Sequence, residues 1–226
     1  MHAVGTTIVD LLRHGEPEGG KRFRGQRDDP LSELGWRQLW DAVGNDAPWQ
    51  EIVSSPLQRC AAFAEALATR HGLPVRLEPA FKEIGFGSWE GETPEAIRQR
   101  YAEEYRRYRA DPLSFMPPGA EPMAAFMERV ARAWDTLLAT RRGRRVLIVC
   151  HAGVVRAVLA AVLGVTPAAL FRIHIGYASR TRLVASEKTM QRWSFMTAGP
   201  QEPGADRLAV GAACRRPARR GDKHPR

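Results

Sequence analysis

Cysteine is scarce in this sequence. Its 226 residues include three cysteines, Cys60, Cys150 and Cys214, which are widely spaced and form no Cys-x-x-Cys pair. An odd number of isolated cysteines argues against a disulfide framework, and free cysteines are typical of proteins in a reducing compartment. We therefore expect a cytoplasmic protein.

Long hydrophobic runs are also lacking. The longest nearly apolar stretch, residues 153–165, contains Arg156 and is too short to cross a bilayer. The first residues show no basic segment followed by an apolar one, so no signal peptide is indicated. We expect no association with membranes.

Metal-binding and nucleotide-binding patterns are missing. The six histidines form no His-x-His or His-x-x-x-His pair, and no acidic cluster accompanies them. The sequence also has no Gly-x-x-x-x-Gly-Lys-Ser/Thr motif, which excludes a P-loop. We therefore predict that the protein needs no metal ion and no other cofactor.

Acidic residues are outnumbered by basic ones, 25 to 34, which gives a formal charge of +9. Such an excess is typical of proteins that bind acidic small molecules or nucleic acid. In residues 199–226, seven basic and three acidic residues occur without apolar periodicity, which predicts a disordered basic tail. Residues 1–198 are expected to form one domain, and nucleic acid is not an expected partner.

One short segment near the start carries chemically reactive side chains. Residues 7–12 form a β-branched and leucine run that predicts a strand buried on both faces, as in a parallel sheet. Arg13 and His14 follow where this strand ends, and ligands collect at the carboxyl ends of strands in open α/β sheets. A cation beside a potential nucleophile indicates a candidate active site. Gly15 would let the backbone turn close to a bound group.

A second segment has the same design. Residues 145–150 form another apolar run, and His151, Ala152 and Gly153 follow it directly. Two such strands can deliver one histidine each to the same edge of a sheet. The sequence thus predicts an α/β domain with both histidines in one site.

Four motifs in order connect these segments to a known family. They are Leu-Leu-Arg-His-Gly-Glu at 11–16, Ser-Pro-Leu-Gln-Arg at 55–59, Glu-Ile-Gly-Phe-Gly-Ser-Trp-Glu-Gly at 83–91 and Val-Cys-His-Ala-Gly-Val at 149–154. The set resembles the histidine phosphatase superfamily, the phosphoglycerate-mutase-like proteins. This resemblance implies a three-layer α/β/α fold with a mostly parallel central sheet, and phosphatase chemistry through a phosphohistidine.

The resemblance also implies a role for each catalytic candidate. His14 is the nucleophile, and neighbouring arginines favour its neutral ring because their charge opposes protonation. Arg13, Arg59 and His151 would bind the phosphoryl oxygens, for which the geometry of arginine is well suited. Glu83 would protonate the leaving oxygen and later take a proton from water.

Two further residues are candidates for substrate binding. Arg24 lies in a Phe-Arg-Gly segment where the family has a loop over the phosphate, and a solvated basic turn is the alternative interpretation. Ala152 follows the second histidine, and its small side chain would allow close approach of the backbone. Many relatives have an asparagine at the position of Gly20, so the group that replaces this donor is left open.

A lid-like helical insertion is expected over about residues 92–122. Residues 94–110 predict one amphipathic helix whose inner face carries Ile97, Tyr101, Tyr105 and Tyr108. This helix either packs its tyrosines inward or lines the substrate entrance, where an arginine would meet a second acidic group of the ligand.

The last part of the domain is predicted to be extended. Residues 170–178 and 182–185 are interpreted as strands, with His174 on one strand face, and residues 191–196 as an edge hairpin.

The motifs narrow the range of possible substrates but do not identify one substrate. The segment from Glu83 to His151 lacks the longer insertion of cofactor-dependent mutases, and the motifs together resemble alpha-ribazole phosphatases of cobalamin biosynthesis. We predict hydrolysis of a small phosphorylated metabolite, with α-ribazole 5′-phosphate as the first candidate. The alternatives are a broad phosphatase on sugar or nucleotide phosphates, a phosphoglycerate mutase and a non-catalytic phosphate-binding module. A homodimer is compatible with the sequence.

Overall fold

Helices and strands alternate along most of the chain in the computed structural model, which describes residues 5–166, 169, 172–185 and 196–198. The elements in chain order are β1 (Thr7–Arg13), α1 (Glu33–Val43), β2 (Glu51–Ser54), α2 (Gln58–His71), β3 (Val75–Leu77), the short 3-10 helices η1 (Pro79–Phe81) and η2 (Gly87–Trp89), α3 (Pro94–Arg100), α4 (Ala102–Ala110), α5 (Met123–Thr140), β4 (Arg145–Cys150), α6 (Ala152–Leu163), β5 (Arg180–Ala185) and β6 (Met196–Ala198).

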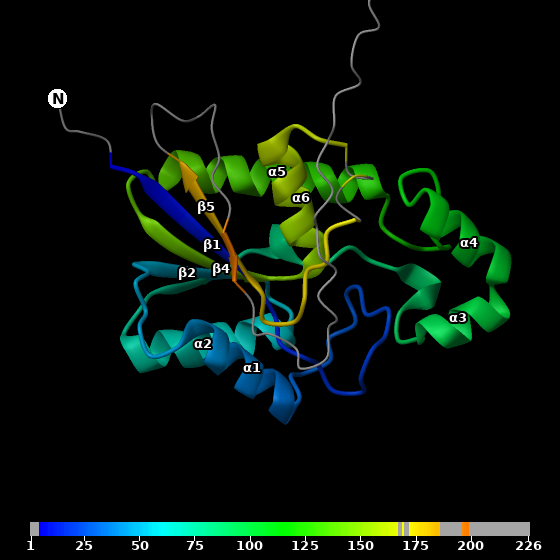
Figure 1. Ribbon diagram of the computed structural model, residues 1–226, viewed down its shortest axis with the longest axis horizontal. Coiled ribbons are helices and arrows are strands. Elements are labelled where there is room, and N and C mark those ends of the chain that lie inside the picture. The colour runs from blue at the N-terminus through cyan, green and yellow to red at the C-terminus, as the bar shows by residue number, and fades with distance from the viewer. Residues whose placement is uncertain (1–4, 167–168, 170–171, 186–195, 199–226) are drawn as a thin grey trace, which may run out of the picture.

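A six-stranded sheet forms the middle layer, with the strand order β3-β2-β4-β1-β5-β6 (Figure 1). Strands β3, β2, β4 and β1 are parallel to one another. Strand β5 pairs antiparallel with β1, and β6 pairs antiparallel with β5. The predicted mostly parallel sheet is therefore confirmed.

Helices cover both faces of this sheet. Figure 1 shows α5 and α6 on one face and α1 and α2 on the other. Side chains of β4 alternate between the layers, because Val146 and Ile148 pack in the α5–α6 cluster whereas Leu147 and Val149 pack in the α1–α2 cluster. Burial on both faces explains why the strand reads as a continuous apolar run. The expected three-layer α/β/α fold is present.

The register of the two central strands sets the position of the site. Strands β1 and β4 are parallel, and Arg13 lies opposite Cys150. Both strands therefore end level, and the next residue of each, His14 and His151, leaves the sheet at the same edge. The backbone N–H of His14 still donates to the Cys150 carbonyl at 2.9 Å.

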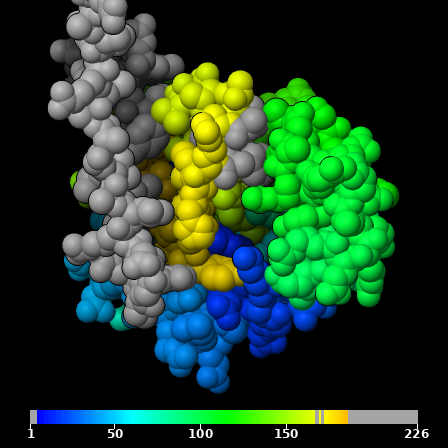
Figure 2. All heavy atoms as spheres, turned by 45° about the vertical axis from the view of Figure 1, so that its right-hand side comes forward, coloured from blue at the N-terminus to red at the C-terminus, as the bar shows by residue number. Residues whose placement is uncertain are grey.

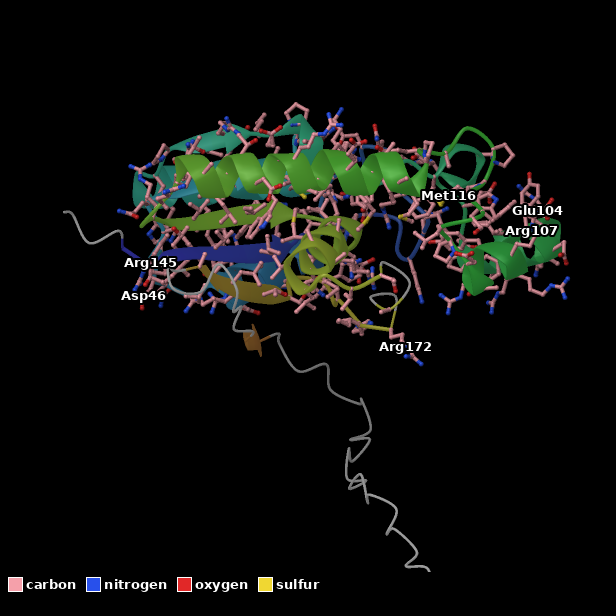
Figure 3. All side chains as sticks on the ribbon, turned by 90° about the horizontal axis from the view of Figure 1, so that it is seen from above. Asp46, Glu104, Arg107, Met116, Arg145 and Arg172 are labelled. Atoms are coloured by element: carbon pink, nitrogen blue, oxygen red, sulfur yellow. The ribbon has the colours of Figure 1, made fainter. Side chains whose placement is uncertain are left out.

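The lid segment contains two helices, α3 and α4, at one end of the domain. Figure 3 shows Glu104 and Arg107 there, at the opposite end from Asp46 and Arg145. The prediction of a single helix over 94–110 is wrong, because the backbone leaves helical geometry at Tyr101, with φ −133° and ψ 48°.

The break at Tyr101 has a packing cause. Ile97 and Tyr108 belong to one buried cluster with Trp89. In a straight helix their positions would lie about 16 Å apart along the axis, too far to share one indole. Turning at Tyr101 brings both side chains onto Trp89, and it leaves Tyr101 itself 37% exposed rather than on the inner face.

The chain after α6 differs in part from its prediction. Residues 182–185 are confirmed as part of β5, but the described residues 172–178 form turns and irregular backbone, so the predicted strand is wrong there. His174 is exposed and does not lie on a strand face. Residues 170–171, 191–195 and the predicted tail, 199–226, lie outside the described residues.

Within the part of the chain that the structure describes, no helix is both long enough and apolar enough to cross a bilayer.

Candidate active site

His14 and His151 lie against each other at the carboxyl edge of the sheet. Their ring centroids are 5.2 Å apart, and the two planes meet at 61°. Burial lowers the pKa of both imidazoles well below 6.5, and the charges of Arg59 and Arg13 lower both further. Both rings are therefore neutral at pH 7.

The backbone fixes which nitrogen of His14 carries the proton. Nδ1 lies 2.7 Å from the carbonyl oxygen of Gly15. A carbonyl can only accept, so Nδ1 is the donor, and in the neutral ring Nε2 keeps the lone pair. The geometry therefore presents Nε2 as the nucleophilic atom.

His151 contacts the Ser-Pro-Leu segment, residues 55–57. Its Nε2 shares a hydrogen bond of 2.8 Å with Oγ of Ser55, which also accepts from the N–H of Leu57. The sulfur of Cys60 lies 3.6 Å from the same nitrogen. We did not single out Ser55 from the sequence, although its position in the motif beside Arg59 was a usable signal.

The predicted arginines Arg13 and Arg59 both donate hydrogen bonds to backbone oxygens. Arg13 Nη1 donates to the Ile175 carbonyl at 2.5 Å, and its guanidinium stacks 4.1 Å from the centre of the Tyr177 ring. Arg59, which is 1% exposed, donates to two carbonyls of the loop 25–27, each at 2.7 Å. These contacts orient two cations beside His14.

Each of these arginines also has one buried N–H donor that makes no hydrogen bond within the described residues. The Nε atoms of Arg13 and Arg59 are buried and have no hydrogen-bond partner among the described residues. A buried donor without a partner costs about 1–3 kcal/mol, so such groups in native proteins need an explanation. An anion bound beside His14 would supply the acceptor that both donors lack.

Arg24 is the third arginine close to His14, and it is 7% exposed. Its Nε pairs with Asp29 at 3.1 Å, and its Nη2 donates to the carbonyls of Glu18 and Gly20 at 2.6 and 2.5 Å. These bonds fold the loop 17–30 over the site. Direct contact of Arg24 with substrate stays a prediction.

Glu83 meets the start of helix α6. Its Oε2 accepts from the N–H of Gly153 at 3.1 Å, and its Oε1 accepts from its neighbour Ile84 at the same distance. A Cβ at Gly153 would overlap Oε1, so only glycine allows this contact. Ala152, the first residue of the helix, lies at the same wall.

An arginine that we missed in the sequence holds the chain on both sides of Glu83. Arg129, on α5, donates to the carbonyls of Ala80 and Lys82 at 2.6 and 2.9 Å and to that of Glu83 at 3.1 Å. It also pairs through two nitrogens with Glu121, at 2.6 and 2.8 Å. Arg129 belongs to none of the four motifs, so no sequence signal pointed to it.

Gly15 is required by its packing against α1, whereas its predicted close approach to a bound group stays a prediction. A Cβ there would overlap the carbonyl of Gly35, at the first turn of α1. Gly35 in turn lies directly on Glu16, whose carbonyl accepts from Ser32 at 2.9 Å. The glycine pair therefore lets α1 approach the end of β1 closely.

The site opens into a cleft of about 770 Å³, within the usual range for small-molecule sites. Figure 2 shows the hollow between the yellow segment around residue 172, the green lid and the blue loop near residue 22. All predicted site residues except His151 line it, namely Arg13, His14, Arg24, Arg59, Glu83 and Ala152. His151 lies behind them with no exposed surface. No group of three or more His, Cys, Asp or Glu side chains in the described residues could hold a metal ion.

Solved structures of known proteins share this architecture. A mycobacterial glucosyl-3-phosphoglycerate phosphatase superposes with a TM-score of 0.73 and 30% identity, covering 84% of this chain and 97% of the other. The fold is therefore one that supports a phosphatase in another protein.

Sequence comparison identifies the family. A bifunctional protein of Mycobacterium tuberculosis is 35% identical over 76% of this chain, and the match spans about half of that relative, 49%. An adenosylcobalamin/alpha-ribazole phosphatase of Salmonella typhimurium is 28% identical over 73% of this chain and 84% of its own length. The sequence model of the histidine phosphatase superfamily (branch 1) matches residues 9–195. The chain therefore belongs to the histidine phosphatase superfamily.

Proposed function

We propose that this protein hydrolyses a phosphomonoester through a phosphohistidine formed on Nε2 of His14. The observation that carries the proposal is the pair of buried, unpartnered Nε donors of Arg13 and Arg59 beside a neutral imidazole. Two guanidinium groups and a nucleophilic nitrogen in one cleft match the needs of a phosphoryl group, whose charge is spread over three oxygens during transfer.

In the first step, Nε2 of His14 attacks phosphorus and the bond to the ester oxygen breaks. Arg13 and Arg59 stabilise the charge on the equatorial oxygens, and Glu83, in its protonated form, gives its proton to the leaving alkoxide. The products are the free alcohol and a phosphoryl group bonded to Nε2.

In the second step, water attacks the phosphohistidine. Glu83, now a carboxylate, takes one proton from that water while the bond between Nε2 and phosphorus breaks. Inorganic phosphate leaves, and both His14 and Glu83 return to their starting forms. His151, which has no exposed surface, lies against the ring of His14 and supports its position.

A radiolabelled phosphomonoester tests this assignment. The enzyme is mixed with ³²P-labelled p-nitrophenyl phosphate and the reaction is stopped with alkali, because phosphohistidine is stable to base and labile to acid. We expect the label on His14. Glu83→Gln should accumulate the labelled enzyme, since p-nitrophenolate leaves without a proton whereas hydrolysis of the intermediate needs the base. His14→Gln should carry no label and turn over at least ~10³-fold more slowly. Near-normal turnover in His14→Gln would refute the mechanism.

The substrate proposal follows from the motifs and the relatives. The motif set and the relative named adenosylcobalamin/alpha-ribazole phosphatase support α-ribazole 5′-phosphate. The aromatic side chains Phe86, Tyr105 and Tyr177, which line the cleft, would suit its flat ring system.

A second candidate is favoured by the charge of the cleft. The structural neighbour named glucosyl-3-phosphoglycerate phosphatase acts, by that name, on a phosphoester that also carries a carboxylate. The many arginines that line the cleft support such an acidic substrate.

A panel of esters separates the candidates. The kcat/KM values for α-ribazole 5′-phosphate, glucosyl-3-phosphoglycerate, 3-phosphoglycerate and p-nitrophenyl phosphate should differ by more than tenfold if the enzyme is selective. A spread below tenfold favours a broad phosphatase. Conversion of 3-phosphoglycerate to 2-phosphoglycerate without release of phosphate would identify a mutase.

A further inference from the structure

Tyr177 lies against both reactive side chains at the end of β1. The centre of its ring is 5.8 Å from that of His14, and the guanidinium carbon of Arg13 lies 4.1 Å from the same centre. None of the four motifs contains this tyrosine. It belongs to the segment 172–178, drawn in yellow, which borders the hollow in Figure 2. Its ring therefore forms part of the cleft wall beside the nucleophile.

The backbone next to Tyr177 is bonded to the end of β1. The N–H of Ala178 donates to the carbonyl of His14 at 3.2 Å. The N–H of Arg13 donates to the carbonyl of Ser179 at 3.0 Å. These bonds hold the tyrosine at a defined position relative to the nucleophile.

Ala178 has a backbone conformation that alanine rarely adopts. Its φ is 52°, the only positive value of a described residue other than glycine. It occupies the third position of a turn that the N–H of Ser179 closes on the Gly176 carbonyl at 3.3 Å, and glycine or asparagine is usual there at a positive φ. Strained residues of this kind persist where the surrounding contacts enforce them, and they cluster at functional sites. The turn thus positions Tyr177 at a cost in free energy, which is an argument for a function of that side chain.

The hydroxyl of Tyr177 makes no hydrogen bond with any described residue, and the side chain is only partly buried. Burial lowers the pKa of Arg13, and the phenol oxygen of Tyr177 is the strongest influence in the opposite direction. The same two influences, in the same order, act on the pKa of Arg24. The phenol oxygen therefore lies within electrostatic reach of two of the arginines beside His14. A phenol O–H is a hydrogen-bond donor, and here it has an open side toward the cleft.

We propose that the hydroxyl of Tyr177 donates a hydrogen bond to an oxygen of the transferred phosphoryl group, which makes Tyr177 a further catalytic residue. The inference rests on the proposed function, because it places the phosphoryl group at His14. Tyr177 adds a neutral donor to the charged donors of Arg13 and Arg59, and the three equatorial oxygens of the transition state then each have a donor available. The donor that the sequence left open at Gly20 is supplied from a distant part of the chain.

Tyr177→Phe tests the hydroxyl, because it keeps the ring that contacts His14 and Arg13. A preorganised donor to a developing oxyanion contributes about 10²–10³ in rate, and the partial exposure of Tyr177 reduces this, so we expect phosphoryl transfer to slow at least ~10-fold. First-turnover release of the leaving group should slow by the same factor with p-nitrophenyl phosphate and glycerol 3-phosphate, because the phosphoryl group is common to both. Loss of Glu83 should instead slow the alkyl ester far more.

Binding of inorganic phosphate gives a readout that does not depend on the reaction. Phosphate should raise the urea midpoint of the wild-type protein, because a ligand of the folded state shifts the unfolding equilibrium. Tyr177→Phe should need about ten times more phosphate for the same rise, the effect of losing one hydrogen bond to a charged group. The rise is compared and not the midpoint itself, so a change in the stability of the unliganded variant does not enter.

Tyr101→Phe is the matched control. Tyr101 is 37% exposed at the break between the lid helices, so loss of its hydroxyl should change neither the rates nor the binding of phosphate. Wild-type rates and wild-type phosphate binding in Tyr177→Phe overturn the proposal. Slowing confined to one ester also overturns it, because the hydroxyl then acts on the leaving group. An equal loss in Tyr101→Phe does the same.

Failure of this inference and failure of the proposed function look different. If the wild-type enzyme forms phosphohistidine and Tyr177→Phe forms it equally fast, only the role of Tyr177 is lost. A wild-type enzyme that forms no phosphohistidine from either ester contradicts the proposed function itself.

Discussion

Gly153 and Glu83 are joined by a contact that only glycine permits. The N–H of Gly153 donates to Glu83 Oε2 at 3.1 Å, and a Cβ at 153 would overlap Oε1 of the same carboxylate. The start of α6 and the proposed general acid are therefore fitted to each other. Any side chain at position 153 must push the carboxylate out of its place.

Gly153→Ala should consequently slow the hydrolysis of alkyl phosphates by about 10²-fold, the lower end of what general acid–base catalysis supplies. The first-turnover release of p-nitrophenolate from p-nitrophenyl phosphate should slow much less, because this leaving group needs no proton, although later turnovers still need Glu83 as the base. Comparing the pre-steady-state rates of leaving-group release from glycerol 3-phosphate and p-nitrophenyl phosphate measures the difference.

Gly85→Ala is the matched control for this prediction. A Cβ at Gly85 meets its nearest atoms at 3.7 Å, which is ordinary van der Waals contact, so this variant should behave as the wild type. Full activity of Gly153→Ala on alkyl phosphates would remove Glu83 from the role of acid.

Arg129 should affect proton transfer by Glu83 indirectly, through the backbone that positions Glu83. Its guanidinium holds the carbonyls of Lys82 and Glu83 and pairs with Glu121, so Arg129→Gln loosens the backbone that positions the acid. We expect the first-turnover release of glycerol from glycerol 3-phosphate to slow more than that of p-nitrophenolate from p-nitrophenyl phosphate. The loss of charge-assisted hydrogen bonds should also lower the free energy of unfolding by about 1–3 kcal/mol.

Two further variants, Arg129→Lys and Arg132→Gln, serve as controls for this prediction. Lysine keeps the charge but cannot bond Glu121 and several carbonyls at once, so it should restore activity only in part. Arg132, on the same helix, pairs with Glu128 on the exposed face, and its loss should change neither rate. Equal slowing of both esters in Arg129→Gln would indicate a general loss of structure instead of an effect on the acid.

The centre of the fold and of the site was predictable because local pattern and topology agree there. An apolar run that ends in a reactive residue, found twice, fixes two parallel strands with level ends, and His14 and His151 must then meet. Ser32 directly precedes α1, and its hydroxyl caps the helix by accepting the N–H of Gly35 at 3.0 Å.

The periphery was less predictable because distant contacts decide it. The break at Tyr101 depends on Trp89, which lies before the helix in the chain. The segment 172–178 alternates in polarity like a strand, yet the side chain of Arg13 holds its Ile175 carbonyl and no neighbouring strand does. The need for glycine at position 15 also comes from a distant contact, the carbonyl of Gly35. None of these partners is close in sequence.

The neutral histidines should make the fold sensitive to acid. The pKa of His14 is lowered well below 6.5 by burial and by Arg13, so in the folded state the ring stays neutral where the unfolded chain takes up a proton. The unfolded state binds more protons below pH 6.5, and stability therefore falls as pH falls through that region. A histidine that stays neutral down to pH 5 contributes up to about 2 kcal/mol of this loss.

Urea unfolding at pH 7 and pH 5 measures this contribution. The wild-type protein should lose more of its free energy of unfolding between the two values than His14→Gln does, by up to about 2 kcal/mol. Titrating groups far from His14 cancel in the difference, whereas His151 touches His14 and its own contribution changes with the variant. An identical loss in both would mean that His14 is protonated as easily in the folded protein as in the unfolded chain.

The thiol of Cys60 should report the opening of the pocket behind the active site. Burial raises its pKa to about 12, and its sulfur lies 3.6 Å from His151 Nε2, so it can react only when the structure opens there. Cys150 is also buried, and burial raises the pKa of its thiol as well.

In a Cys214→Ser background, which removes the cysteine outside the described residues, a thiol reagent at pH 8 should label the native protein slowly and the unfolded protein at both sites. Inorganic phosphate should slow native labelling further, because a ligand of the folded state stabilises it against opening. Rapid labelling of Cys60 that phosphate does not slow would mean that the pocket around His151 is open in the native protein.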